Sequence, residues 1–215
     1  IMTVDGVGEW TTTALYRAEK GAIELLKEID YPDSLGLFYS AITAFLGFRV
    51  NEDEYKVMGL ACYGEPVLES EFNQLITFLA DGSFSLNLDY FSFPYTRKRM
   101  YTDKLIELLG PERNKEDPIT EHHQNIAATA QRFLEKGILG LANHLSSLCE
   151  GETNLCMAGG VALNCTANTE IIRQTVFNEV SIQPAAGDGG GSMGAALYVA
   201  NTMAQNEYTP TAEHS

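Results

Sequence analysis

The chain carries one local pattern twice between residues 155 and 196, and this pattern limits the folds that it can adopt. An apolar run over residues 155–158 leads into G-G-V-A-L-N, and a second short run over residues 180–182 leads into G-D-G-G-G. Each glycine turn is followed by a helix-like segment that begins with small residues. Glycine lets the backbone approach a ligand closely, and the helix N-terminus behind it favours an anionic group. Two such turns side by side on a sheet make a nucleotide site plausible.

Composition and charge argue against several classes of protein. The chain has 215 residues, of which 45% are hydrophobic and 20% charged, so it can bury a substantial core. Its net charge of −15 argues against a nucleic-acid binder, which would carry a basic face. No apolar run is long enough to span a membrane, so we expect no membrane partner. The four cysteines lack zinc-binding spacing, and we therefore expect reduced thiols in a cytoplasmic protein.

The spacing of apolar residues predicts an α/β fold. Runs over residues 1–4, 10–18 and 21–29 predict a β-meander. Residues 119–148 form the longest helical pattern, which we expect to be a central helix packed on the sheet. The other expected elements are helices over 34–47 (with Ser34 as a suitable cap), 52–61, 67–79 and 102–109, a β-ribbon over 83–93, strands over 153–158 and 176–182, and helices over 161–174 and 192–205.

Local patterns leave the roles of three charged residues open. Asp5 ends an apolar strand in an Asp-Gly dipeptide, and this dipeptide is common in hairpin turns. A carboxylate at the end of a buried strand is equally typical of a ligand or metal site, so both interpretations of Asp5 stand. For Glu54 and Lys56 the pattern alone favours a solvated helix face.

Familiar nucleotide and hydrolase motifs do not explain the chain. The letters G-G-G-S-M-G satisfy the G-x-G-x-x-G pattern, but no following strand ends in an acidic residue, as a dinucleotide-binding fold requires. The chain contains no G-x-x-x-x-G-K-[ST] and no H-E-x-x-H motif. The combination that remains is an early strand turn with an aspartate and two late glycine turns.

Four ordered motifs resemble those of the O-carbamoyltransferases, a family that carbamoylates nodulation factors and antibiotics. They begin at Asp5 (D-G-V-G-E-W), Glu54 (E-Y-K-V-M-G-L-A-x-Y-G), Gly159 (G-G-V-A-L-N) and Gly187 (G-D-G-G-G-x-x-G-A-A) and spread over nearly the whole chain. The resemblance implies an actin-like ATPase fold of the ribonuclease H-like type, similar to the ATPase domain that makes threonylcarbamoyl-adenosine in tRNA. It also implies an actin-like domain over residues 1–206, and the polar composition of residues 207–215 predicts a flexible tail.

The resemblance further implies a reaction. Family members make carbamoyl-adenylate from carbamoyl phosphate and ATP in a separate C-terminal domain, and pass the carbamoyl group to an acceptor hydroxyl in the actin-like domain. That acceptor is a small molecule or a glycan. Hydroxyl attack also needs a base, and the sequence offers no clear candidate.

The same resemblance implies roles for eight residues. Two aspartates match the family's ligands for a divalent metal, iron or a similar ion, and the others match segments that bind the nucleotide. The metal ligands are Asp5 and Asp188; the adenosine loop has Gly159, Gly160 and Asn164, with Gly189 in the second glycine turn; Glu54 and Lys56 match the segment near the ribose and phosphate.

The chain departs from the family pattern in two ways. The family's other metal ligands form an H-x-x-x-H pair upstream of the first strand, and this chain contains no such pair. It also lacks the adenylate-forming domain, so we expect a fragment that does not catalyse the complete reaction. Two alternatives stay open, a non-catalytic nucleotide-binding module and a sugar-kinase-like phosphotransferase of the same superfamily. Retention of both aspartates favours the enzyme.

Overall fold

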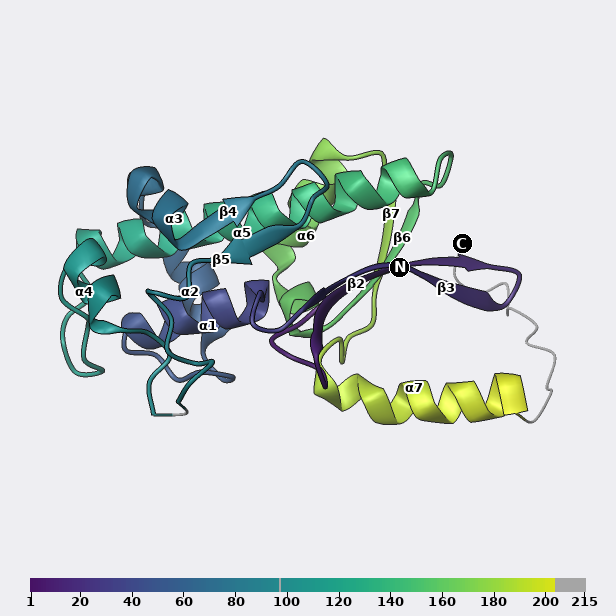
Figure 1. The fold of residues 1–215 in the computed structure, drawn as a ribbon, viewed down its shortest axis with the longest axis horizontal. Helices are drawn as coiled ribbons and strands as arrows, with labels where there is room; N and C mark the ends of the chain where they lie inside the picture. Colours follow the sequence, from purple (N-terminus) through teal and green to yellow (C-terminus); the bar gives the residue numbers. More distant parts are fainter. Residues whose placement is uncertain (97, 204–215) are drawn as a thin grey trace.

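A mixed five-stranded sheet with the strand order β3-β2-β1-β6-β7 forms the centre of the molecule (Figure 1). The computed structural model describes residues 1–96 and 98–203. Strands β1 (Met2–Val4), β2 (Thr11–Glu19) and β3 (Ala22–Asp30) pair antiparallel, which confirms the predicted meander. β6 (Asn154–Ala158) and β7 (Glu179–Ile182) continue the sheet in parallel with β1. The predicted α/β class is therefore confirmed, while the actin-like fold stays a prediction.

The long helix α5 (Glu121–Leu148) runs along the molecule and makes its most extensive helix contacts with three other helices. These are α1 (Leu35–Phe45), α2 (Glu54–Ala61) and α6 (Cys165–Gln174), all visible beside α5 in Figure 1. Ser34 caps α1 as predicted, since its hydroxyl accepts a hydrogen bond from the N–H of Leu37 at 3.0 Å. None of the helices that the structure describes has the length and apolar character needed to cross a bilayer.

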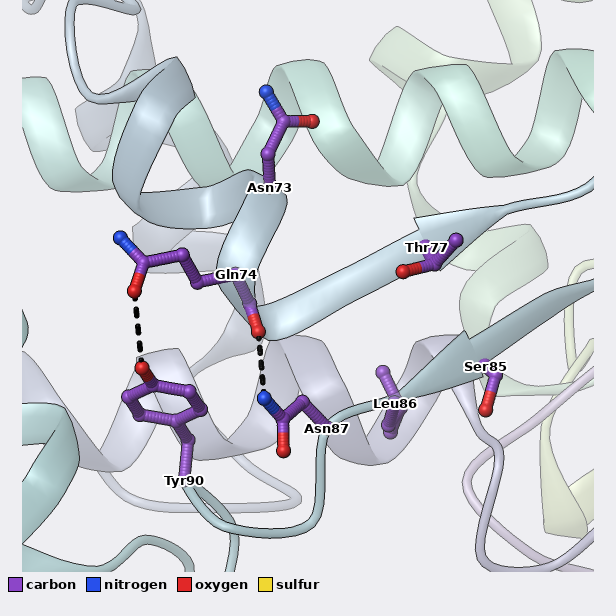
Figure 2. A pocket seen from close by; sticks show the side chains of 7 residues that line it. All are labelled: Asn73, Gln74, Thr77, Ser85, Leu86, Asn87 and Tyr90. Atoms are coloured by element: carbon purple, nitrogen blue, oxygen red, sulfur yellow. Dashed lines mark hydrogen bonds between the residues drawn. The ribbon is translucent and has the colours of Figure 1, made fainter.

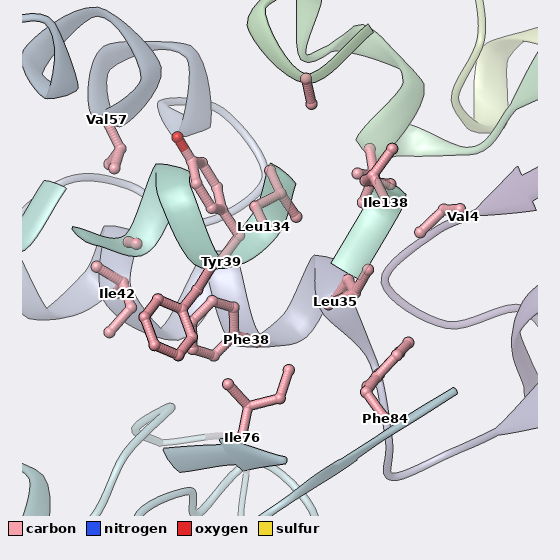
Figure 3. Close-up of a cluster of buried hydrophobic side chains, with 14 of the residues drawn as sticks. Val4, Leu35, Phe38, Tyr39, Ile42, Val57, Ile76, Phe84, Leu134 and Ile138 are labelled. Atoms are coloured by element: carbon pink, nitrogen blue, oxygen red, sulfur yellow. The ribbon is translucent and has the colours of Figure 1, made fainter. Parts of the chain in front are cut away.

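The hydrophobic core lies between α1, α5 and one face of the sheet. Figure 3 shows Val4 of β1 near Leu35 of α1 and Ile138 of α5, and all three side chains are buried. The predicted apolar stripe of α5 is buried up to its last turn, where Leu148 is exposed. Burial of this stripe explains why the central helix could be predicted from residue spacing alone.

The helix predicted over residues 67–79 is wrong in its last part. α3 (Glu69–Leu75) stops early, and β4 (Ile76–Phe78) pairs antiparallel with β5 (Phe84–Leu86) in a separate two-stranded sheet. The turn between them contains Gly82, whose φ of 75° is unfavourable for other residues. The ribbon predicted over 83–93 ends at Leu86, whose N–H donates a hydrogen bond to the Oδ1 of Asp33 at 2.6 Å.

Both late glycine turns are tighter than the expected helix starts. Residues Gly160–Leu163 and Asp188–Gly190 form short 3-10 turns ahead of α6 and of α7 (Gly191–Tyr198), and Val199–Met203 continue α7 as a π-helical turn. The strand predicted over 176–182 begins only at Glu179. The end of the helix predicted over 192–205 and the predicted tail over 207–215 lie outside the described residues. α4 (Asp103–Leu109) agrees with the prediction.

Candidate functional site

Six segments that are far apart in the sequence meet at one cavity of about 560 Å³. They are the turn after β1, the first half of α1, the start of α2, the middle of α5 at Leu134, the turn after β6 and the turn after β7. Five of the eight residues singled out in the sequence line this cavity: Asp5, Glu54, Gly160, Asn164 and Asp188.

Asp5 joins the turn after β1 to the turn after β6. Its Oδ1 accepts hydrogen bonds from the N–H of Gly6 at 2.8 Å and of Gly160 at 3.0 Å. Ser34, the cap of α1, donates to the carbonyl oxygens of Asp5 and Gly6. A side chain at Gly36 would place its Cβ 2.6 Å from the Asp5 carbonyl oxygen, so α1 also approaches this turn closely. Asp5 is thus a turn residue whose carboxylate is held at the cavity, so the turn interpretation is confirmed and the ligand interpretation stays a prediction.

Gly159 permits the approach of two strands and does not line the cavity. Its φ is 95°, and a Cβ there would lie 2.1 Å from the carbonyl oxygen of Val4. Its N–H donates to the carbonyl of Ala186 at 2.8 Å, which ties the turn after β6 to the turn after β7. Gly189 also lies outside the cavity wall, and a Cβ there would meet no atom within 4 Å.

Asn164 belongs both to the cavity wall and to the start of α6. Its Oδ1 accepts the N–H of Ala167 at 3.0 Å and therefore caps the helix. Its amide also forms a reciprocal pair of hydrogen bonds with Gln131, whose Oε1 accepts a further hydrogen bond from the Tyr39 hydroxyl at 2.8 Å. Burial raises the pKa of Tyr39, so its phenol stays neutral.

Glu54 and Lys56 lie on different sides of α2. The Oε1 atom of Glu54 accepts the Ser40 hydroxyl at 2.7 Å and the N–H of Asn51 at 2.8 Å, which holds this carboxylate at the cavity. Lys56 instead forms an ion pair with Asp53 at 2.7 Å and does not line the cavity. Its hydrogen bond to Asp53 raises the pKa of Lys56. Residues two apart on a helix point in different directions, which explains the separation.

The cavity wall is acidic. Its carboxylates come from Asp5, Glu52, Glu54 and Asp188, and the described residues that line it include no lysine, arginine or histidine. A bare phosphate group would meet repulsion here, whereas a cation or a neutral polar group would not. Phosphate binding at this wall consequently calls for a positive ion.

Asp5 and Asp188 suit part of a divalent metal site. Carboxylate oxygens are common ligands of such ions, and both side chains line the same cavity. Within residues 1–96 and 98–203, no group of three or more histidine, cysteine, aspartate or glutamate side chains is arranged to hold a metal. Asp5 and Asp188 alone would therefore not complete a ligand set.

A second, more open hollow of about 490 Å³ lies between α3 and the β4–β5 hairpin (Figure 2). Its polar lining carries amides and hydroxyls, with Tyr90 donating to Gln74 at 3.1 Å and Asn87 donating to the Gln74 carbonyl at 3.1 Å. None of the residues singled out in the sequence lies there. The candidate site is therefore the acidic cavity.

Sequence reasoning missed three polar residues of the site region. Tyr39 and Ser40 line the cavity from α1, and Gln131 stands behind it on α5. All three fall among apolar positions of predicted helices, where a polar side chain is unusual. That exception to the apolar pattern was the available signal.

Comparison with known proteins identifies a family. A family model described as "Carbamoyltransferase N-terminus" matches residues 1–197 of the chain. The chain is 35% identical over 207 residues to nodulation protein NolNO of Sinorhizobium fredii and 34% identical over 204 residues to nodulation protein NolO of Bradyrhizobium diazoefficiens. It is 46% identical over 209 residues to a Synechocystis protein with the name uncharacterized protein sll1178.

These matches cover nearly all of this chain but a smaller part of each relative. The alignments include 96%, 94% and 96% of the chain for NolNO, NolO and the Synechocystis protein. They include 28%, 35% and 34% of those proteins, so the chain spans about a third of the length of the curated relatives it matches.

Proposed function

The chain belongs to the carbamoyltransferase family, and we propose that its acidic cavity binds the adenosine part of carbamoyl-adenylate for carbamoyl transfer to a hydroxyl group. The acceptor would be a small molecule or a glycan. The main support is the convergence of segments from residues 5, 54, 160, 164 and 188 on a single cavity. Family membership supports a transferase, and the nodulation proteins NolNO and NolO are relatives over nearly the whole chain.

In the proposed transfer, the acceptor hydroxyl oxygen attacks the carbamoyl carbon. A new carbon–oxygen bond forms, the bond from that carbon to the adenylate phosphate breaks, AMP leaves, and the hydroxyl proton passes to solvent. Glu54, held by Ser40 and Asn51, would accept a ribose hydroxyl hydrogen bond through its other oxygen. Asn164 and the turn at Gly160 would hold the adenosine.

The metal proposal rests on the two aspartates. Asp5 and Asp188 would hold a divalent ion, iron or similar, together with ligands from elsewhere in the protein. Such an ion supplies positive charge that stabilises the negative charge developing on oxygen during acyl transfer. Asp5 is prepared for this role because two backbone N–H groups fix its carboxylate.

A second candidate is a nucleotide-binding module without transfer activity. The partial ligand set favours it, because the described residues supply no third ligand of the usual types beside Asp5 and Asp188. Measured carbamoyl transfer by the longer protein, together with its loss on Asp188→Asn, would exclude this candidate.

Calorimetric titration with ATP, in the presence and absence of a divalent metal, tests the proposal. We expect ATP binding to need the metal, because the cavity wall is acidic, and we expect Asp188→Asn to abolish this metal-dependent binding. Glu116→Gln is the matched control, an exposed acidic residue outside the cavity, and should bind like the wild type. Metal-independent ATP binding that Asp188→Asn leaves unchanged would contradict the proposal.

A further inference from the structure

Gln131 is a buried polar side chain in the apolar stripe of α5, and its amide is fully used. Only 5% of the residue is exposed. Its Nε2 donates to Glu135 at 2.9 Å and to Asn164 at 3.0 Å. Its Oε1 accepts from Asn164 at 2.9 Å and from the Tyr39 hydroxyl at 2.8 Å. A side-chain amide offers two N–H groups and two lone pairs, so Gln131 has no group left to bind a ligand.

Two groups at the ends of this network decide which way the amides point. The ionised carboxylate of Glu135 can only accept, so the Nε2 of Gln131 must face it. The N–H of Ala167 can only donate, so the Oδ1 of Asn164 must face the start of α6. Both constraints lead to the same arrangement, in which the Oε1 of Gln131 faces Tyr39 and the Nδ2 of Asn164.

The partners of Gln131 line the cavity, whereas Gln131 itself does not. Tyr39 reaches the wall from α1, and Asn164 reaches it from the start of α6. An apolar side chain of similar volume would fill the position of Gln131 without the cost of burying an amide. Hydrophobic packing therefore does not explain why a glutamine occupies position 131. Its hydrogen bonds to Tyr39 and Asn164 do explain it.

We infer that Gln131 is a positioning residue of the site, which holds Asn164 and Tyr39 in one arrangement against bound adenosine, and that Glu135 sets the direction of its amide. This inference rests on the proposed function, since it supposes that the cavity binds adenosine. Neither Gln131 nor Glu135 lines the cavity, so both act through other side chains.

The first test is calorimetric titration of the chain with adenosine. Gln131→Met should weaken binding about tenfold, because Asn164 and Tyr39 both lose a hydrogen-bond partner. Gln74→Met is the matched control: the same substitution at an exposed position of α3 beside the other hollow. It should leave the affinity for adenosine unchanged.

A conservative variant separates positioning from packing. Glu135→Gln should retain adenosine binding, because its amide oxygen still accepts from Gln131, whereas Glu135→Met should lose several-fold in affinity. Nuclear magnetic resonance of the Asn164 side-chain amide gives an independent readout. Its hydrogen exchange should be slow in the wild type and in Glu135→Gln, and faster in Glu135→Met and Gln131→Met.

The outcomes separate this inference from the proposed function. If Asn164→Ala weakens adenosine binding but Gln131→Met binds like the wild type, the inference is wrong and the proposed function stands. If the wild type binds no adenosine with or without metal, the proposed function is wrong and the inference falls with it. Should Gln131→Met fail to fold, Glu135→Met takes its place, and wild-type affinity in that variant overturns the inference.

Discussion

At the scale of single residues, Gly159 brings the two halves of the site together. Its positive φ and its contact with the Val4 carbonyl allow β1 and β6 to run side by side. The turns that follow these strands hold Asp5 and Gly160, whose hydrogen bond crosses between them. A residue outside the cavity wall thus decides whether the wall forms.

We expect Gly159→Ala to destabilise the fold by about 3 kcal/mol or more, because the new Cβ meets the Val4 carbonyl and the backbone becomes strained. Gly189→Ala is the matched control, since its Cβ would meet no atom within 4 Å, and it should change the free energy of unfolding little. Urea denaturation of both variants checks this. Equal stability of the two would contradict the assignment of Gly159.

Glu135 should lower the free energy of unfolding as the pH rises, whereas most acidic residues raise it. Burial is the largest influence on Glu135 and raises its pKa, and the charge of Glu170 adds to this, while the hydrogen bond from Gln131 and the charge of Arg132 oppose it only in part. The ionised form therefore costs stability at neutral pH, and this cost disappears as the pH falls through the folded-state pKa towards the unfolded value.

Removing the charge tests this direction. Glu135→Gln should gain free energy of unfolding relative to the wild type at about pH 7, and the gain should shrink at about pH 4. Urea denaturation at both pH values measures the difference. A gain that is larger in acid would mean that burial does not control this carboxyl group.

Motifs located part of the site from sequence, and packing determined the rest. Asp5, Glu54 and Asn164 could be singled out because they stand in motifs, and all three line the cavity. Gln131 could not, because its importance depends on a partner 33 residues away that only the fold brings near. Lys56 shows the reverse case, a motif residue whose side chain pairs with Asp53 outside the cavity.

At the scale of elements, α7 differs from every other α-helix because none of its residues is buried. It lies apart from the other helices in Figure 1, although its side chains are mostly small or apolar. Met193, Leu197 and Tyr198 are each more than 40% exposed. Exposed apolar surface of this kind favours association.

We therefore expect the isolated chain to bind a hydrophobic fluorescent dye and to self-associate at high concentration. Leu197→Glu should reduce both, because it places a charge in the exposed apolar surface of α7. Val67→Glu is the control, a single exposed apolar residue far from α7 in the sequence. Dye fluorescence and light scattering measure the effect, and an equal reduction by both variants would argue against α7 as its source.

Elements with a clear residue period were predicted well, and those set by distant contacts were not. α1 and α5 follow their apolar spacing, and Ser34 supplies the expected cap. The switch from α3 to β4 depends on pairing with β5 and on the Asp33 contact to Leu86. Asp33 lies 53 residues before Leu86, so a window of local sequence does not contain that contact, and the helical pattern appeared to continue.

At the scale of the whole molecule, negative charge should slow the approach of anionic ligands. The net charge is −15, and the cavity wall is itself acidic. The association rate of ATP with metal present should therefore rise with ionic strength, as salt screens the repulsion. The rate for neutral adenosine should hardly change. Stopped-flow measurements at low and high salt compare the two ligands, and a fall in the ATP rate would contradict this account.

The pairing of β1 with β6 also has a consequence for biosynthesis. β1 is complete at residue 4, but the strand on its other side ends at residue 158. A ribosome needs roughly ten to thirty seconds to synthesise the intervening chain. During that interval the nascent β-meander carries an unpaired strand edge of the kind that invites aggregation. Nascent chains stalled before residue 154 should accordingly depend on chaperones more than the finished chain does.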